Sequence, residues 1–206
     1  MPRFQHLVVH PGNPQPRLLQ QAAERLRDGD IALLPTVAGY LLGCRLEDKA
    51  ASQRLTRLAA LDDRDPPVLL CRDLAQAAAW LHIDDQAYRA IRQRAPGTAS
   101  FTLPCTRRVP RRLASGAKGV ALLYFAGHAA SQELLQLLDE PLLLALPPSG
   151  AGAGCVEQAP ATWHHGMDLA INAGLLPALA VFPPRRGREP SAHNDRLVAE
   201  VVPLAC

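Results

Sequence analysis

Short apolar runs alternate with longer mixed stretches along most of this 206-residue chain. The apolar runs have the length of buried strands, and the mixed stretches carry the start and stop residues of helices. The first predicted helix spans 14–29, with Asn13 as its cap, Pro14 in its first turn and Gly29 at its end. Strands that alternate with helices predict an α/β sheet with helices packed on it.

The remaining predicted elements follow in a regular order. Strands are predicted at 31–36, 39–46, 66–71, 98–105, 119–126, 141–148, 168–174 and 177–182. Helices are predicted at 47–61, 73–83, 85–95 and 128–140, with short helical turns at 109–116 and 161–167. The first two strands are too close in sequence for a parallel crossover, so they predict an antiparallel pair within a mixed sheet.

The composition changes near residue 183, where the chain becomes polar and rich in proline (PPRRGREPSAHNDR). We therefore predict one domain at 1–182 and a loosely held tail at 183–206 that ends in a short apolar piece. No apolar run approaches the roughly 18 residues of a membrane helix, and the first residues do not have the pattern of a secretory signal. A cytoplasmic location is expected, with no membrane contact.

Positive charge is carried almost entirely by arginine, since Lys49 and Lys118 are the only lysines, although the formal net charge is just +3. Arginine can bind a phosphate through two parallel hydrogen bonds. The densest cluster consists of Arg107, Arg108, Arg111 and Arg112, followed by Lys118. Two interpretations stay open for this cluster: a solvated basic turn, or contacts to the phosphates of an RNA backbone. Aromatic residues are too scarce to support stacking of single-stranded bases.

Three other patterns do not indicate a catalytic or metal site. The five cysteines are scattered without a CxxC pair, so we expect reduced thiols rather than a zinc site or disulfides. His164, His165 and Asp168 have no further ligand at a suitable spacing, which favours a surface turn. The stretch SGAGAGC at 149–155 has Cys155 where the dinucleotide-binding fingerprint needs a glycine, so it is predicted as a loop.

Several segments resemble one family in the same order. These are HPGNPQPRLLQQAAERLRDGDIALLPTVAGYLLGC from His10, then VLLCRDL, PGTASFTL, VPRRL and DEPLLL. Together they resemble the YrdC/YciO family, most closely its YciO branch, over about His10 to Phe182. The resemblance implies a twisted, mixed open sheet with flanking helices and a concave, positively lined groove. Family members are associated with double-stranded RNA or tRNA, and the catalytic members are threonylcarbamoyl-AMP synthases, which use ATP, L-threonine and bicarbonate in tRNA modification.

The resemblance also implies candidate binding residues. Pro35-Thr36 corresponds to the turn that places a hydroxyl at the mouth of the family's pocket, and Ser100 stands where the family has a threonine. Arg57 precedes the family's Lys-x-Arg pair and either faces the groove or lies on the surface. The candidate ligand or RNA contacts are Thr36, Arg57, Ser100, Arg111, Arg112 and Lys118.

The polar groups that the synthases use are replaced in this chain. We call six residues the synthase positions: Ala59 and Leu61 for the Lys-x-Arg pair, Tyr124 for a further arginine, His128 for an asparagine, and Leu144 and Leu146 for the Ser-x-Asn pair. In addition, the family's hydroxyl-rich strand near the C-terminus reads LPALAVFP here. Adenylyl transfer depends on positioned charges around the phosphates, so these replacements predict a pocket that does not bind ATP as the synthases do.

Three hypotheses follow. The first is a YciO-like protein that binds RNA or a nucleotide-like ligand in its groove without synthase activity or a cofactor. The alternative is an enzyme, either a divergent threonylcarbamoyl-AMP synthase that uses ATP and magnesium or a hydrolase of a related compound. The third is a scaffold without a ligand that acts through a protein partner, with the apolar groove as the interface.

Overall fold

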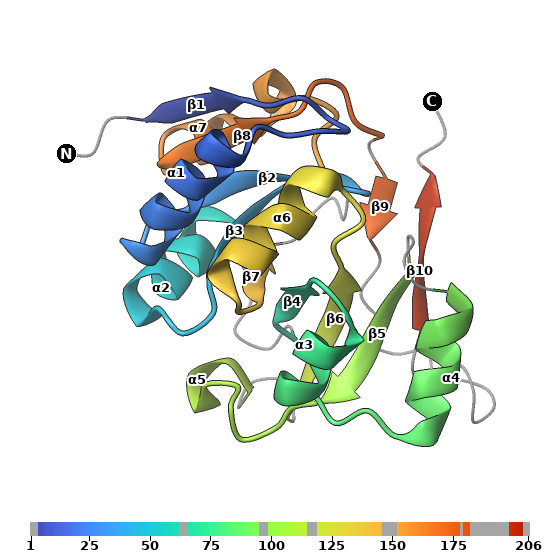
Figure 1. Cartoon of the computed structure of the whole chain (residues 1–206). Helices are drawn as coiled ribbons and strands as arrows, with labels where there is room; N and C mark the ends of the chain where they lie inside the picture. The colour runs from blue at the N-terminus through green and yellow to red at the C-terminus, as the bar shows by residue number, and fades with distance from the viewer. Residues whose placement is uncertain are drawn as a thin grey trace.

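The computed structural model describes residues 4–61, 66–94, 99–114, 119–145, 152–177, 179–181 and 198–203. Ten strands form one twisted sheet in the order β1-β8-β2-β3-β7-β4-β6-β5-β10-β9, with helices packed on both faces (Figure 1). The strands are β1 Gln5–Val8, β2 Ala32–Thr36, β3 Gly39–Arg45, β4 Val68–Cys71, β5 Ala99–Pro104, β6 Val120–Phe125, β7 Leu142–Ala145, β8 Leu169–Asn172, β9 Leu179–Val181 and β10 Val198–Pro203. The helices are α1 Pro16–Arg27, α2 Lys49–Leu58, α3 Leu74–Trp80, α4 Asp85–Arg94, α5 Arg111–Ala114, α6 Ala129–Leu138 and α7 Ala161–His164, with a 3₁₀ turn at Val156–Gln158.

The sheet is mixed, which confirms the predicted fold class. Its parallel pairs are β1 with β8, β8 with β2, and β4 with β6. The predicted antiparallel pair is the β2–β3 hairpin, in which Leu33 lies opposite Leu42 and Thr36 lies opposite Gly39. The other neighbours in the sheet, through β7, β5, β10 and β9, are antiparallel.

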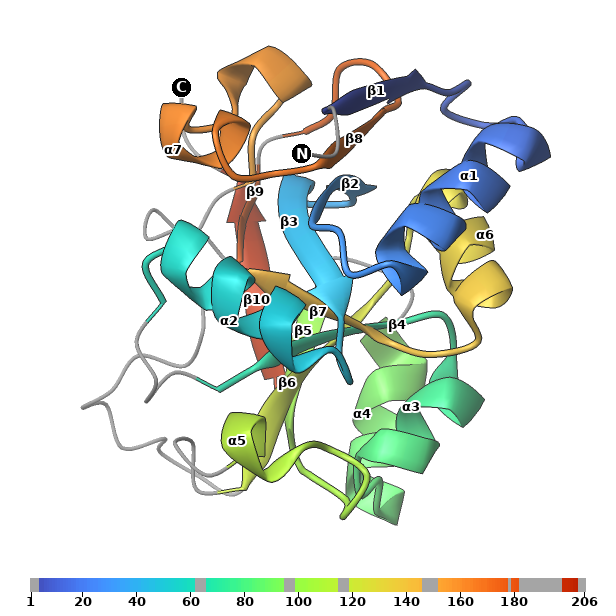
Figure 2. The same cartoon turned by 90° about the vertical axis from the view of Figure 1, so that its left-hand side faces the viewer.

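Alternate residues of the central strands enter two separate cores, one on each face of the sheet. On β3, Leu42 and Cys44 join a core with α2, α3 and α4, whereas Leu41 joins a core with α1 and α6. Figure 2 shows α2 on one side of β3, and α1 and α6 on the other. The central strands are therefore covered on both faces, as their nearly continuous apolar sequences predict.

The N-terminal region and the C-terminal segment differ from the predictions. The first helix begins at Pro16 with Gln15 as its cap rather than Asn13, because the backbone N–H groups of Gly12 and Asn13 donate to Nδ1 of His10 in a separate turn. Strand β1 was not predicted. The expected tail at 183–206 contains β10, which pairs with β5 and β9, so the sheet continues beyond the boundary placed at residue 182.

Gly39 allows the β2–β3 hairpin to pack closely against the chain segment that follows β7. Its φ of +98° is in the left-handed region, and a Cβ atom there would lie 2.6 Å from the carbonyl oxygen of Ala153. The next residue, Tyr40, exchanges backbone hydrogen bonds of 2.7 and 3.1 Å with Ala153. The turn is thus held against residues 152–153 by contacts that leave no space for a side chain at position 39.

Gly39→Ala is expected to lower the free energy of unfolding by about 3 kcal/mol or more, because backbone strain and a backbone clash add together. Gly119→Ala is the matched control: its φ is +74°, but no atom of the described residues lies within 4 Å of the added Cβ. It should cost only the strain, about 1 kcal/mol. Urea unfolding of both variants measures the difference, and equal losses would contradict close packing at Gly39.

Candidate functional site

The hydroxyl of Thr36 is used within its own turn. Thr36 is 2% exposed, its Oγ1 donates to the carbonyl of Gly39 at 2.6 Å, and the same atom accepts from the N–H of Ala38 at 3.1 Å. These bonds satisfy two backbone groups that would otherwise be unpaired in a buried turn. A polar residue inside an apolar stretch therefore has a structural explanation here. Its role as a ligand contact stays a prediction.

The N-terminus of α6 packs directly beside this turn. A Cβ atom on Gly127 would lie 2.4 Å from Cγ1 of Val37, and the hydroxyl of Ser131 donates to the carbonyl of Pro35 at 2.5 Å. His128 caps the helix, because its Nδ1 accepts from the N–H of Ala130 at 3.2 Å. Burial lowers the pKa of His128, which favours the neutral imidazole that this acceptor role requires. His128, which the sequence predicts at the position of the synthase asparagine, thus has a capping function in this structure.

The synthase positions do not come together in one polar site. Tyr124 and Leu144, each 1% exposed, lie in the core beneath α1 and α6. Ala59 is buried in the core on the opposite face of the sheet, and Leu61 packs against that core. Leu144 occupies the space above Gly43, where an added Cβ atom would lie 3.0 Å from its Cδ2. Leu146 lies outside the described residues.

Tyr124 contributes the most unusual polar atom of this core. Its hydroxyl is fully buried and has no hydrogen-bond partner, and burial raises the pKa of the group well above its ordinary value. Tyr124 lies opposite Ser100 of β5 in the β5–β6 register. Ser100 is itself buried, so the hydroxyl that was predicted as a ligand contact is not on the surface.

The candidate arginines fall into two groups. Arg112 binds the carbonyls of Leu46 and Glu47 at 3.1 and 3.3 Å, and its Nε lies 3.4 Å from the hydroxyl of Ser52. It therefore fastens α5 to the start of α2. Arg111 is exposed on α5, and Arg57 is exposed on α2, where its Nε donates to the carbonyl of Gln53 one turn earlier. Lys118 lies outside the described residues.

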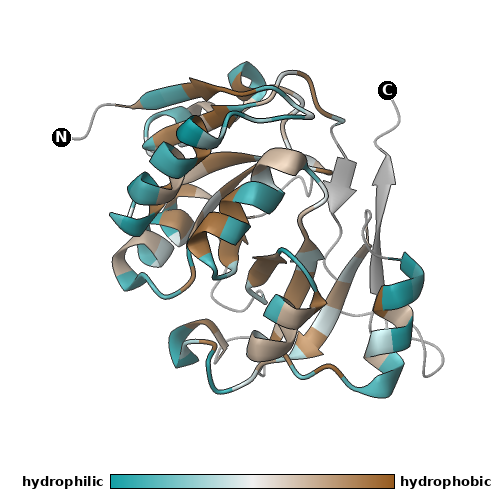
Figure 3. Cartoon of the chain, viewed as in Figure 1, coloured by the Kyte–Doolittle hydropathy of each residue, from teal (hydrophilic) through white to brown (hydrophobic). Residues whose placement is uncertain are grey.

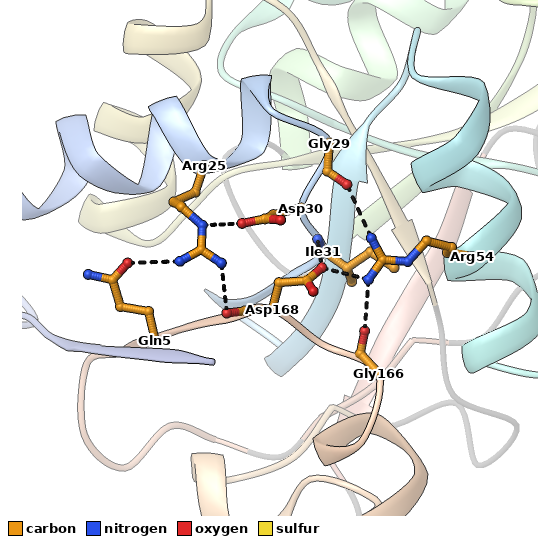
Figure 4. Close-up of polar contacts among 8 residues, drawn as sticks. All are labelled: Gln5, Arg25, Gly29, Asp30, Ile31, Arg54, Gly166 and Asp168. Carbon is orange, nitrogen blue, oxygen red and sulfur yellow. Dashed lines mark hydrogen bonds and ion pairs between the residues drawn. The ribbon is translucent and has the colours of Figure 1, made fainter. Parts of the chain in front are cut away.

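A partly buried ionic cluster that the sequence did not reveal lies at the other end of β2 (Figure 4). Oδ2 of Asp168 accepts from the N–H of Ile31 at 2.9 Å and from Arg54 at 2.7 Å. Arg25 pairs with Asp30 and donates to Oε1 of Gln5 at 3.1 Å. Because each charge has a partner, the cluster joins α1, α2, β1 and β8 to the start of β2 and has no free group for a ligand. Asp168 is thus a structural residue.

The described part of the chain offers no metal site and no activated thiol. No group of three or more His, Cys, Asp or Glu side chains in it is arranged to hold a metal ion. Cys44, Cys71, Cys105 and Cys155 are free thiols in this structure. Burial raises the pKa of Cys44 to about 12 and that of Cys105 to about 11, so neither is a thiolate at neutral pH. None of the helices in the described ranges is long and apolar enough to span a membrane.

Comparison with known proteins identifies the family. The family model Sua5_yciO_yrdC, described as telomere recombination, matches residues 24–154. The chain belongs to the Sua5/YciO/YrdC family. The uncharacterized protein YciO of Escherichia coli (strain K12) is 36% identical over 175 residues, which are 84% of this chain and 85% of YciO. A threonylcarbamoyl-AMP synthase of Alkalilimnicola ehrlichii is 31% identical over 186 residues, 90% of this chain and 95% of that enzyme.

Solved structures of the family share the fold. The crystal structure of Escherichia coli YciO matches with a TM-score of 0.81 at 34% identity, covering 86% of this chain and 87% of YciO. Sua5 from P. abyssi, crystallised with L-threonine, matches with a TM-score of 0.76 at 18% identity, covering 85% of this chain and 52% of Sua5. Because the identity to Sua5 is only 18%, this likeness shows a shared fold and nothing further. The resemblance to the YciO branch is confirmed.

Tyr124→Phe is expected to raise the free energy of unfolding by about 1 kcal/mol, because it removes a buried hydroxyl that has no partner and keeps the ring. Tyr40→Phe is the control. The hydroxyl of Tyr40 donates to the carbonyl of Gly174 at 2.7 Å and accepts from the N–H of Ala173 at 2.8 Å, so its removal should destabilise the fold. Denaturant unfolding measures both. A destabilised Tyr124→Phe variant would show that the hydroxyl has a bonded partner in solution.

Proposed function

We propose that this chain is a YciO-like protein that binds RNA without making threonylcarbamoyl-AMP. The observation that carries this proposal is the burial of the synthase positions. Tyr124 and Leu144 are packed in one core, and Ala59 is packed in the other. A triphosphate needs fixed positive charges or donors around it, and these residues supply none at the places where the synthases have them.

The apolar residues at the synthase positions also argue against weak ATP binding and slow threonylcarbamoyl-AMP synthesis. A phosphate placed against Leu144 would lose its hydration and gain no compensating hydrogen bond. Tyr124 lies in the same core, and burial raises the pKa of its hydroxyl, so it supplies no charge to a phosphate at physiological pH. We therefore expect no bound ATP or magnesium, and we place the synthase and hydrolase hypotheses second.

Unpaired arginines support the RNA part of the proposal. Within the described ranges Arg107, Arg108 and Arg111 are exposed, and none of them forms an ion pair with a carboxylate. Their charge is thus available to an external anion. Several arginines on one short stretch can neutralise neighbouring phosphates and release bound counterions, which makes binding strong at low salt. A nucleotide-like small ligand would use the same chemistry with fewer contacts.

Pyrophosphate release from ATP tests the absence of synthase chemistry. With magnesium, L-threonine and bicarbonate present, the chain should release no more pyrophosphate than in the threonine-free control. The Alkalilimnicola ehrlichii synthase, run under the same conditions, shows that the assay works. Threonine-dependent release by this chain would overturn the proposal, because other side chains would then have to supply the missing groups.

Arg111→Ala should weaken RNA binding and lower the slope of log affinity against log salt by about 1, because it removes one phosphate contact. Arg112→Ala should lower the thermal unfolding temperature, since Arg112 holds the carbonyls of Leu46 and Glu47. Fluorescence anisotropy at several salt concentrations and thermal unfolding separate the two effects. Arg17→Ala, at an exposed position on α1, is the control. RNA affinity that is independent of salt would contradict the electrostatic basis of the proposal.

A further inference from the structure

Helix α5 is attached to the rest of the fold by few contacts. It has four residues, and none of them is buried. Its backbone hydrogen bonds are local, since the N–H groups of Leu113 and Ala114 donate to the carbonyl of Pro110 at 2.9 and 3.3 Å. No described helix or strand packs closely against it, and Figure 3 shows a hydrophilic outer turn on α5. A helix of this length is not stable by itself, so its position depends on tertiary contacts.

The chain on both sides of α5 is held by backbone hydrogen bonds. Before the helix, the N–H of Thr106 donates to the carbonyl of Trp80 at 2.8 Å. After it, the N–H of Gly119 donates to the carbonyl of Ala114 at 2.9 Å, and the carbonyl of Gly119 accepts from the N–H of Cys105 at 2.7 Å. Helix α5 therefore belongs to a connection between β5 and β6 that is fixed at both ends.

One side chain links α5 to a distant part of the sequence. Nη2 of Arg112 donates to the carbonyls of Leu46 and Glu47 at 3.1 and 3.3 Å, and its Nε lies 3.4 Å from the hydroxyl of Ser52. These partners lie at the end of β3 and in the first turn of α2, and Ser52 is only 2% exposed. Arg111, the other polar residue of α5, forms no hydrogen bond or ion pair within the described residues.

The apolar contacts of this segment are also few. Val109 is 2% exposed and belongs to the core with α2, α3 and α4. Leu113 and Ala114 pack against the same core but are only partly buried. We call residues 109–114 the strap. Segments with few buried apolar contacts open at a lower free energy than the whole fold.

We propose that the strap opens as a unit while the sheet remains folded, and that Arg112 is the latch that keeps it closed. Opening breaks the hydrogen bonds of Arg112, exposes the side chain of Val109 and uncovers the hydroxyl of Ser52. The backbone hydrogen bonds of Thr106 and Gly119 are outside the strap and stay intact. The closed position thus depends on one guanidinium and a small apolar contact.

The strap also determines where Arg111 lies relative to Arg108. Arg108 is fixed outside the strap, because its guanidinium lies over the ring of Trp80 at 4.7 Å from the centroid. Arg111 is on the strap and moves with it. Opening therefore changes the spacing of these two exposed charges, which makes the strap a device that regulates contacts of Arg111. The inference goes beyond the proposed function, since opening of the strap does not require RNA.

Labelling of a thiol at position 109 tests the opening. Val109→Cys places a thiol of similar size at this buried position, and iodoacetamide is the probe. Cys71, fully buried in β4, is the reference within the same molecule, because it becomes accessible when the sheet unfolds. Peptide mass spectrometry gives both labelling rates at several urea concentrations below the unfolding transition. Position 109 should be labelled faster than Cys71 and almost independently of urea, because local opening exposes little surface.

Replacement of Arg112 in the Val109→Cys chain tests the latch. Arg112→Ala should speed labelling at position 109 about tenfold, the effect of losing roughly one hydrogen bond from a charged group. Arg111→Ala, the matched control on the same helix, should leave this rate unchanged. Arg112→Lys keeps the charge without the planar set of donors, so its rate should lie between those of arginine and alanine. Circular dichroism verifies the fold of each variant, and the rate at Cys71 reports any loss of global stability.

Two results would overturn the inference. If position 109 and Cys71 are labelled at the same rate and with the same dependence on urea, the strap opens only when the whole fold does. If Arg111→Ala speeds labelling as much as Arg112→Ala, Arg112 is not the latch. Should Arg112→Ala fail to fold, the comparison of Arg112→Lys with the unmodified latch decides the second point. RNA binding is measured separately, so a failure of the proposed function leaves these results unchanged.

Discussion

Burial of the central strands on both faces is the constraint on which the rest of this structure depends. Strands β2, β3, β7, β4 and β6 send alternate residues into two apolar cores, so their interior positions must be apolar and closely matched in volume. Leu34 and Leu144 fill the space above Gly43 in this way. A charged side chain at position 144 would lose its hydration without a partner. The packing that stabilises the sheet therefore excludes charged side chains from these interior positions.

Burial also constrains the polar groups inside the fold, because a buried polar group needs a hydrogen-bond partner. Most of those in the described residues have one. Asp168 accepts from the backbone of Ile31 and from Arg54, and Thr36 satisfies two backbone groups of its own turn. The Tyr124 hydroxyl is an exception, since it is buried and has no hydrogen-bond partner among the described residues. The ring of Tyr124 fills this part of the core, and its oxygen is buried without a compensating hydrogen bond from the described residues.

The sequence predicted the central elements well because their signals are local. Apolar runs and helix starts identified β2 to β8 and α1 to α7 within a few residues. Strand β1 was missed because it is an edge strand with one fully buried residue, Leu7, so its pattern is weak. Strand β10 was missed because a polar, proline-rich segment precedes it and its pairing with β5 spans about half of the chain.

Long-range polar contacts could not be read from the sequence in the same way. Arg112 belonged to a basic cluster by its position, and only the fold shows that its partners are at Leu46, Glu47 and Ser52. Arg111, its neighbour, has no such partner. The sequence therefore identified the basic cluster. It could not show which of its arginines bind other parts of the fold and which remain exposed. That division depends on which carbonyls and carboxylates the tertiary fold brings near each guanidinium.

The distribution of charge connects these points to function. Ion pairs neutralise the arginines that lie beside the sheet, and the two cores exclude charge from the sheet itself. In the described residues, arginines without a carboxylate partner are exposed on several elements, among them Arg17 on α1, Arg57 on α2 and Arg111 on α5. The packed interior thus stabilises the fold, whereas these exposed charges have no ion pair within the described residues.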